Sequence, residues 1–311
     1  SAPRTKTPRT QSILTDIATC NWRRLRRLPI HGMQKNGPLR AVFICTKKVQ
    51  AMLFLLSPAK SLDYDTPLPP ELPHTLPQFV SDSAQLIDVL KEKSPQDIAS
   101  LMSISDTLAG LNVARFGAWR SKFTAANSRQ AIMAFNGDVY EGLQAQRLSA
   151  DDLGWAQDHL AILSGLYGVL RPLDWMQPYR LEMGTRLPTS AGATLYKFWG
   201  PRIAEYLNKR LRADTTPVVV NLASQEYFKS VDLKTLKARV IECVFEDYKS
   251  GQYKIISFYA KRARGLMARY AIENRLTTPH QLEGFNVEGY AWHAASSSPE
   301  RLVFRRKVAG N

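Results

Sequence analysis

The stretch MLFLLSPAKSLDY, residues 52–64, contains the segment around which a fold can be built. Leu53–Leu56 is a short apolar run that stops at Ser57-Pro58, and such a run predicts a strand buried on both faces. Val218–Leu222 is β-branched and uncharged, and it predicts a second strand of the same kind. Strands buried on both faces favour a sheet that is surrounded by helices.

The remaining segments alternate between strand-like and helix-like patterns. Capping sequences that begin at Ser94 and Ser149 predict helix starts, and Ser250-Gly251 predicts a β-hairpin between strands at 239–246 and 253–259. A hairpin within an alternating pattern favours a mixed α/β (α+β) fold, with one domain at 52–311 built on a mixed β-sheet. Further strands are expected at 131–135, 160–163 and 302–305, and further helices at 196–212 and 260–275.

Residues 1–51 form the most basic part of the sequence. They contain eleven Lys or Arg and one acidic residue, a net charge of +10, which leaves +5 for residues 52–311. Their composition, rich in Thr, Pro and Arg, predicts a basic, disordered N-terminal extension. This extension is interpreted either as a nucleic-acid-binding arm or as a stretch upstream of a natural start at Met52.

The cysteine, histidine and hydropathy patterns indicate which classes of protein are excluded. The three cysteines and five histidines are scattered without metal-binding spacing, so we expect no metal and no cofactor. A sparse, odd number of cysteines is typical of a reducing cytoplasm. No apolar run approaches the roughly 20 residues of a membrane span, and we expect no membrane partner.

The stretch SDTLAGLNVARFGAW, residues 105–119, joins two helix-like runs. Gly110 and Asn112 tolerate a left-handed backbone, and Leu111 between them can anchor a turn. Exposed backbone N–H groups at such a turn, with Arg115 one helical turn further on, would hold a phosphate. We therefore predict a helix-hairpin-helix at Gly110, Leu111 and Asn112 that grips the DNA backbone. The alternative is an ordinary helix end at Gly110, followed by a second helix.

A second basic feature lies in YAKRARGLMARY, residues 259–270. Only Glu273 opposes its cations locally, so we expect a positive face that is not neutralised within its own helix. Tyr259 and Tyr270 would either stack on exposed bases or pack into the core. With the hairpin, this run predicts a positively charged cleft for a nucleic-acid backbone. The cations are Lys261, Arg262, Arg264 and Arg269.

Polar residues follow three of the strand-like runs. Ligands gather at the C-terminal ends of strands in sheets wrapped by helices, so these residues predict a cleft. A lysine beside tyrosine and serine suits either acid–base chemistry or anion binding. No nucleophile elbow, P-loop or similar motif specifies a reaction, so an enzyme is the alternative and not the prediction. The predicted lining is Lys60, Asn221, Ser224, Tyr227, Lys229 and Lys261, joined by Arg171, Arg180 and Glu182 from the segment 168–184.

Several long segments resemble a known family. MLFLLSPAKSLDY, ISDTLAGLNVARF, LSGLYGVLRPLDWMQPYRLEMGTRL, VVVNLASQEYFKSV, KIISFYAKRARGLMARYAIENRL and GFNVEGY are similar to the YaaA family of bacterial peroxide-stress proteins. The resemblance runs from Met52 to about Arg306. It implies a cytoplasmic protein of the hydrogen-peroxide response that lowers iron-driven oxidative damage. It also implies DNA binding through a helix-hairpin-helix and a positively charged cleft, and it implies no established reaction.

The residues and the resemblance together predict a protein that binds the backbone of duplex or branched DNA without sequence specificity. DNA-repair proteins are candidate partners, and the oligomeric state is left open. The alternative is an enzyme or small-anion binder that uses the cleft at the strand ends. A third interpretation, an iron-handling protein, would need carboxylate ligands, and no Asp/Glu set has a suitable spacing.

Overall fold

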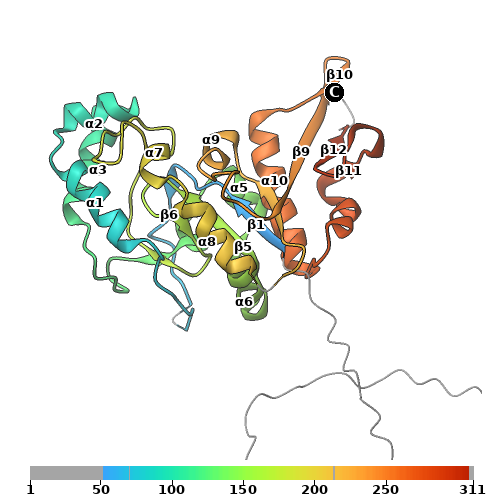
Figure 1. The fold of residues 1–311 in the computed structure, drawn as a ribbon, viewed down its shortest axis with the longest axis horizontal. Coiled ribbons are helices and arrows are strands. Elements are labelled where there is room, and N and C mark those ends of the chain that lie inside the picture. Colours follow the sequence, from blue (N-terminus) through green and yellow to red (C-terminus); the bar gives the residue numbers. More distant parts are fainter. Residues whose placement is uncertain (1–51, 70, 213, 308–311) are drawn as a thin grey trace, which may run out of the picture. The chain divides into compact units, whose positions relative to one another are not determined.

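A central β-sheet organises the residues that the computed structural model describes, which are 52–69, 71–212 and 214–307 (Figure 1). Its order is β11-β12-β9-β8-β1-β5-β6, with β10 paired to β9. Neighbours from β12 to β5 run parallel, and β6, β10 and β11 are antiparallel to their partners. The strands are β1 (Met52–Leu56), β5 (Leu160–Ser164), β6 (Gly168–Leu170), β8 (Val218–Leu222), β9 (Arg239–Lys249), β10 (Gln252–Lys254), β11 (Ala291–Trp292) and β12 (Arg301–Arg306).

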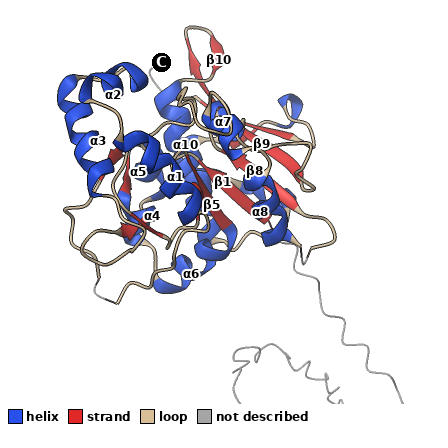
Figure 2. Ribbon diagram, turned by 60° about the vertical axis from the view of Figure 1, so that its left-hand side comes forward, coloured by secondary structure: helices blue, strands red, loops and turns tan. Residues whose placement is uncertain are grey.

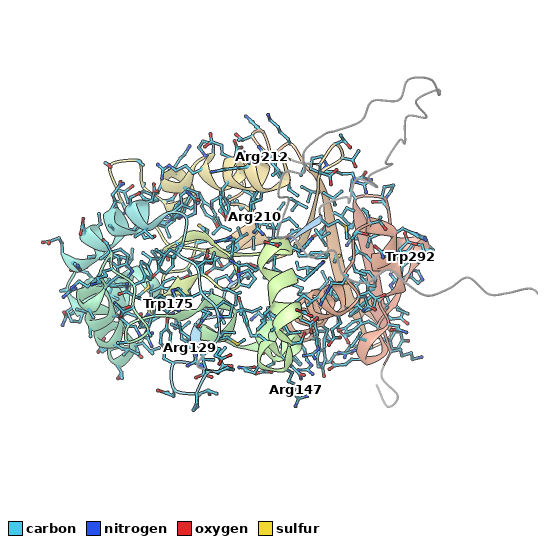
Figure 3. The ribbon with its side chains drawn as sticks, turned by 90° about the horizontal axis from the view of Figure 1, so that it is seen from below. Arg129, Arg147, Trp175, Arg210, Arg212 and Trp292 are labelled. Carbon is cyan, nitrogen blue, oxygen red and sulfur yellow. The ribbon has the colours of Figure 1, made fainter. Side chains whose placement is uncertain are left out.

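Helices cover both faces of this sheet, with α8 on one side and α6 and α10 on the other (Figure 3). Helices α1, α2 and α3 group at one end (Figure 1), and Figure 2 distinguishes the helices from the strands by colour. The mixed α/β class predicted from the sequence is confirmed. The α-helices are α1 (Val80–Lys91), α2 (Pro95–Met102), α3 (Asp106–Ala118), α4 (Ala131–Ala134), α5 (Asp138–Leu143), α6 (Ala150–His159), α7 (Leu195–Trp199), α8 (Arg202–Leu211), α9 (Gln225–Phe228) and α10 (Ser257–Glu273).

Short elements complete the description. Two small antiparallel sheets join β2 (Ser61–Leu62) to β4 (Phe135–Asn136) and β3 (Arg129–Gln130) to β7 (Trp175–Met176). The 3₁₀ helices are η1 (Ala145–Arg147), η2 (Pro279–Gly284), η3 (Val287–Gly289) and η4 (Ala294–Ser296). Residues 1–51, for which the sequence predicts a disordered extension, lie outside the described residues.

Strand β1 lies in the middle of the parallel part of the sheet. Phe54 is opposite Leu160 of β5 on one side and opposite Val220 of β8 on the other. Each of its five side chains is at most 1% exposed. Burial on both faces explains why its sequence is a continuous apolar run and not an alternating one.

Local sequence chemistry accounts for several element ends. Ser94 and Ser149 each cap a helix through a reciprocal capping box, with Asp97 and Asp152 as the third helical residues. Ser250 and Gly251 both have positive φ, and they connect β9 to β10 in the predicted antiparallel hairpin. The strand expected at 253–259 is shorter, because β10 ends at Lys254 and α10 already begins at Ser257. The residues that interact in each of these motifs lie within four positions of one another, so the sequence alone specifies the motifs.

The predicted hairpin at Gly110, Leu111 and Asn112 is wrong. These residues lie inside α3, which runs without interruption from Asp106 to Ala118. The true turn between α2 and α3 is at 103–105, where Ser103 takes the left-handed conformation with φ 52°. Ser105 caps α3, and the Asn112 side chain donates to the Leu108 carbonyl at 2.8 Å. The N–H groups at the predicted turn are therefore used inside the helix.

Two other expected elements also differ. The segment 131–135 forms the short helix α4 and the first residue of β4 instead of a strand. The helix expected at 196–212 is divided into α7 and α8, because Gly200 has φ 48° and Pro201 follows it. A proline lacks the N–H that would continue the helical hydrogen bonds.

Helices α5 and α10 cross in close contact, and two glycines make this possible. A Cβ atom at Gly265 would overlap the Val139 carbonyl oxygen, and one at Gly142 would overlap the Arg262 carbonyl oxygen. Each glycine thus faces the backbone of the other helix. The contact sets the position of α10 relative to the residues that follow β4.

Replacing Gly110 and Gly265 with alanine distinguishes the two kinds of helical glycine. Gly110→Ala should raise the free energy of unfolding by about 0.5–1 kcal/mol, because it is helical and a Cβ there meets nothing within 4 Å. Gly265→Ala should lower it by about 1–3 kcal/mol through overlap with α5. Urea denaturation measures both. Destabilisation by Gly110→Ala would indicate a left-handed turn at that position.

Candidate functional site

The carboxyl ends of β1 and β8 lie side by side at the centre of the sheet. Strand β5 pairs with one edge of β1, whereas β8 pairs with the other edge and is followed outward by β9. The direction in which the chain adds parallel strands to the sheet therefore reverses between β1 and β8. In open parallel sheets such a switch point leaves a crevice in which ligands bind. Ser57 and Ser224 join the two ends, since the Ser224 N–H donates to Ser57 Oγ at 2.8 Å.

A pocket of about 420 Å³ opens at this crevice, and we call it the strand-end pocket. Its residues come from the loop after β1, the β4–α5 junction, Glu182, α9 and α10. The volume is within the range of small-molecule sites. The lining residues are Ser57, Pro58, Ala59, Lys60, Ser61, Asn136, Gly137, Asp138, Val139, Glu182, Ser224, Glu226, Tyr227, Lys261 and Arg264.

Carboxylates hold two of the lining cations. Lys60 Nζ lies 2.9 Å from Glu182 Oε1, to which Arg180 Nη2 also donates at 3.1 Å. Lys261 Nζ lies 3.7 Å from Asp138 Oδ2. Because the lining has as many acidic as basic side chains, the predicted positively charged cleft is not seen in this wall. The acids come from elements distant in sequence, which local charge counting does not include.

Arg264 differs from the other two cations of the pocket. Within the described ranges its guanidinium has no hydrogen bond and no ion pair. Burial lowers the pKa of Arg264, while the Glu242 carboxylate nearby raises it. A half-buried guanidinium that lines a pocket without a partner has donors available for an anionic ligand.

Tyr227 is the tyrosine that lines the strand-end pocket. Tyr227 is buried, and burial raises its pKa well above the usual range, with further contributions from Tyr179 and Glu226. Tyr140 donates to the Ser57 carbonyl at 3.1 Å. Tyr227 is therefore a neutral hydroxyl at physiological pH, suited to hydrogen bonding and not to acting as a base.

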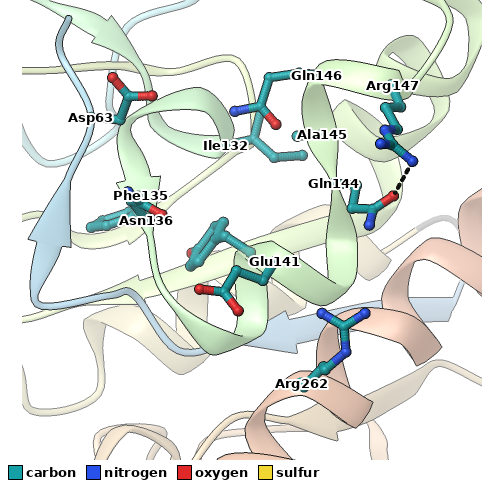
Figure 4. Close-up of a pocket in the computed structure, with 11 residues that line it drawn as sticks. Asp63, Ile132, Phe135, Asn136, Glu141, Gln144, Ala145, Gln146, Arg147 and Arg262 are labelled. Carbon is teal, nitrogen blue, oxygen red and sulfur yellow. Dashed lines mark hydrogen bonds between the residues drawn. The ribbon is translucent and has the colours of Figure 1, made fainter. Parts of the chain in front are cut away.

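A second hollow of about 420 Å³ adjoins the strand-end pocket and shares Asn136 with it. Figure 4 shows Arg262 of α10 rising toward Glu141, and Arg147 hydrogen-bonded to Gln144 at 3.2 Å. Arg262 is already paired, since its Nη2 lies 2.5 Å from Glu288 Oε1. In this hollow, the Arg262 charge is thus neutralised by Glu288.

The predicted basic face of α10 is divided by these contacts. Arg269 pairs with Glu273 at 2.8 Å and donates to the Leu143 and Gln144 carbonyls, so it links α10 to α5. Arg262 pairs with Glu288. Lys261 and Arg264 line the strand-end pocket. Arg262 is therefore neutralised by an acid outside α10, and Arg269 by Glu273, the one local acid that the sequence shows.

Other residues of the predicted cleft lie elsewhere. Asn221 Oδ1 accepts from the Ala223 N–H at 2.9 Å, and Lys229 Nζ lies 5.0 Å from the centre of the Tyr196 ring. Arg171 pairs with Asp174 at 3.4 Å. None of the three lines the strand-end pocket.

Sequence reasoning missed Asp138 as a lining residue. It starts α5 directly after Gly137, just beyond the segment 131–135 for which the sequence predicts a strand. An acidic residue at the start of a helix commonly interacts with the helix dipole. Its sequence context therefore suggests a capping role, and only the position of α10 makes Asp138 a pocket residue.

The chain was compared with protein families and curated proteins. A family model described as "Peroxide stress protein YaaA" matches residues 52–296. A UPF0246 protein of Paracidovorax citrulli is 76% identical over 83% of this chain and all of the relative. One from Albidiferax ferrireducens is 69% identical over 82% of this chain and 98% of the relative.

This chain belongs to the peroxide stress protein YaaA family. The family assignment made from the sequence is thus confirmed. The family match includes every residue of the strand-end pocket. No described helix is long and apolar enough to cross a bilayer. Likewise, among the described residues no group of three or more His, Cys, Asp or Glu could hold a metal ion.

The Arg262–Glu288 pair predicts a pH-dependent contribution to stability. The hydrogen bond from Arg262 lowers the pKa of Glu288 below its unfolded value, although burial opposes the shift. The stabilisation is therefore complete above the unfolded pKa and is lost as pH falls through the folded pKa. Glu288→Gln should lower the free energy of unfolding at pH 7 by about 1 kcal/mol or less, because the pair is partly exposed.

Chemical denaturation at pH 7 and pH 3 measures this effect. The difference between the wild type and Glu288→Gln should shrink at pH 3. The control is Glu300→Gln, which replaces an exposed carboxylate. An equal loss at both pH values would mean that Arg262 is not held by the Glu288 charge.

Proposed function

We propose that this chain is a cytoplasmic DNA-binding protein of the peroxide stress response, which holds the DNA backbone without reading its sequence. The family description supports the role in peroxide stress. The observation that carries the DNA-binding part is the convergence of Lys60, Lys261 and Arg264 around one pocket mouth. We call these three residues the cation cluster. They replace the hairpin at Gly110–Asn112 as the proposed phosphate contact.

Exposure supports the use of these cations by a ligand. The side chains of Lys60 and Lys261 are 67% and 52% exposed. Exposed ion pairs contribute between zero and about 1 kcal/mol, so phosphates can replace the carboxylate partners at little cost. Lys261 and Arg264 are three positions apart on α10 and face the same side of it. Arg264 adds a guanidinium without a partner in the described chain.

An exposed aromatic ring lies next to this cluster in the sequence. Phe258 is 54% exposed and is in the first turn of α10, three residues before Lys261. Among the rings considered from the sequence, Tyr259 lies under the Arg306 guanidinium and Tyr270 contacts Phe285. Phe258 contacts Tyr259 but keeps more than half of its surface exposed. Phe258 is therefore the ring proposed to stack on an unpaired base.

Backbone binding without sequence preference suits a protective role. A protein that contacts phosphates can bind undamaged and damaged DNA alike, duplex or branched, because the phosphates are common to all. We propose that such binding lowers iron-driven oxidative damage at the covered sites and allows DNA-repair proteins to act there. The basic residues of 1–51 would add sequence-independent affinity.

The salt dependence of binding tests the assignment of the cation cluster. Each neutralised phosphate contributes about 0.9 to the slope of log affinity against log salt on duplex DNA. In the full chain, the double substitution Lys261→Ala with Arg264→Ala should flatten this slope by about two units. Fluorescence anisotropy with a labelled duplex and a labelled four-way junction measures the slope.

The matched control is Lys209→Ala with Lys234→Ala, which removes two exposed cations outside the strand-end pocket. This control should change the slope less than the cluster variant. Circular dichroism establishes that both double variants are folded. Equal slopes for the cluster variant, the control and the wild type would remove α10 from the DNA interface.

A further inference from the structure

We propose that the strand-end pocket binds a phosphorylated sugar, either free or as the phosphorylated end of a nucleic-acid strand. This proposal goes beyond backbone binding, because it assigns the pocket to one small ligand unit. It does not depend on whether a duplex binds at the mouth of the pocket.

The location and size of the pocket favour a small ligand. It lies at the point between β1 and β8 where the strand order reverses, which is the usual binding position in open parallel sheets. Its volume of about 420 Å³ accommodates one sugar phosphate but not a folded peptide or a double helix. Pro58, Ala59 and Val139 offer an apolar surface to the face of a sugar ring.

Arg264 is the residue proposed to bind the phosphate group of the ligand. Arg264 lines the pocket, and among the described residues it has no hydrogen bond or ion pair, although the Glu242 carboxylate acts on its charge. Guanidinium groups bind phosphate through two parallel hydrogen bonds. Lys261 projects from the same helix face, and Lys60 reaches the pocket from the loop after β1. Three cations from two separate elements can therefore surround one phosphate group.

The carboxylates that line the same pocket are proposed to bind the hydroxyl groups of the sugar. Asp138, Glu182 and Glu226 line the pocket together with the cations. A bare phosphate that drew Lys261 away from Asp138 would leave that carboxylate without its ion-pair partner, whereas Glu182 and Glu226 would keep donors from Arg180 and from the Gly184 N–H. A ligand that has hydroxyl groups beside its phosphate satisfies both sets, since hydroxyls donate to carboxylates while the phosphate accepts from the cations. The mixed wall thus favours a sugar phosphate over an inorganic anion.

Isothermal titration calorimetry of the full chain tests this inference with ribose 5-phosphate, ribose and inorganic phosphate as probes. Ribose 5-phosphate should bind at least about tenfold more tightly than either of the other two. Arg264→Ala should weaken ribose 5-phosphate about tenfold or more, as expected for a charged hydrogen bond. Asp138→Asn should weaken ribose 5-phosphate but not inorganic phosphate, because only the sugar uses the carboxylate.

The double variant Lys209→Ala with Lys234→Ala serves as the control and should bind ribose 5-phosphate as the wild type does. A 5′-phosphorylated single strand that displaces ribose 5-phosphate, when the unphosphorylated strand does not, identifies a strand end as the source. Failure of both strands to displace it identifies a free sugar phosphate.

The inference is overturned if ribose 5-phosphate produces no binding heat, or binds no more tightly than inorganic phosphate. Equal loss of affinity for ribose 5-phosphate and inorganic phosphate in Asp138→Asn would also overturn it. Neither result affects the proposed DNA binding, whose test is the salt slope on duplex DNA. Conversely, a duplex slope that the cluster variant leaves unchanged, together with tight ribose 5-phosphate binding, would remove α10 from the DNA interface and leave this inference standing.

Discussion

The burial of β1 between two parallel partners is the constraint on which the rest of the structure depends. Hydrogen bonds to β5 and β8 occupy both of its edges, and helices cover both of its faces. The residues that follow its carboxyl end line the strand-end pocket. Since β5 and β8 extend the sheet in opposite directions from β1, the residues that follow β1 and β8 must converge. The strand-end pocket is the consequence of this arrangement.

The contact between α5 and α10 determines what the pocket contains. Gly142 and Gly265 remove two side chains from the crossing, so each backbone touches the other. This closeness brings Asp138, the first residue of α5, within 3.7 Å of Lys261. It also turns Arg264 toward the strand ends. A packing requirement in the helix interior thus sets the charge pattern of the site.

Cations on one helix have different roles because their neighbours differ. Arg262 and Arg269 are held by Glu288 and Glu273, and Arg269 also caps the end of α5 through two carbonyls. Lys261 and Arg264 face a pocket instead. A similar structural use is seen in Arg210 of α8, labelled in Figure 3, which donates to the carbonyls of Gln157, Asp158 and Leu160. Positive charge on a helix is therefore not by itself evidence of a nucleic-acid surface.

The sequence alone determined the features that depend on neighbouring residues. The apolar runs of β1 and β8, the caps at Ser94 and Ser149, and the turn at Ser250-Gly251 are specified by residues within a few positions. The presence of Lys60, Ser224 and Tyr227 after strands also followed from local order. Long, collinear segments were sufficient to assign the family.

Tertiary structure decided the rest, because the deciding partners are distant in the chain. Gly110 permits a turn but does not require one, and the capping of α3 by Ser105 keeps it helical. Glu288 lies 26 residues from Arg262, so no local count of charges includes their pair. Asp138 became a pocket residue only through the crossing of α5 and α10. The sequence specifies which side chains are charged, but tertiary packing determines which of these charges remain available to a ligand.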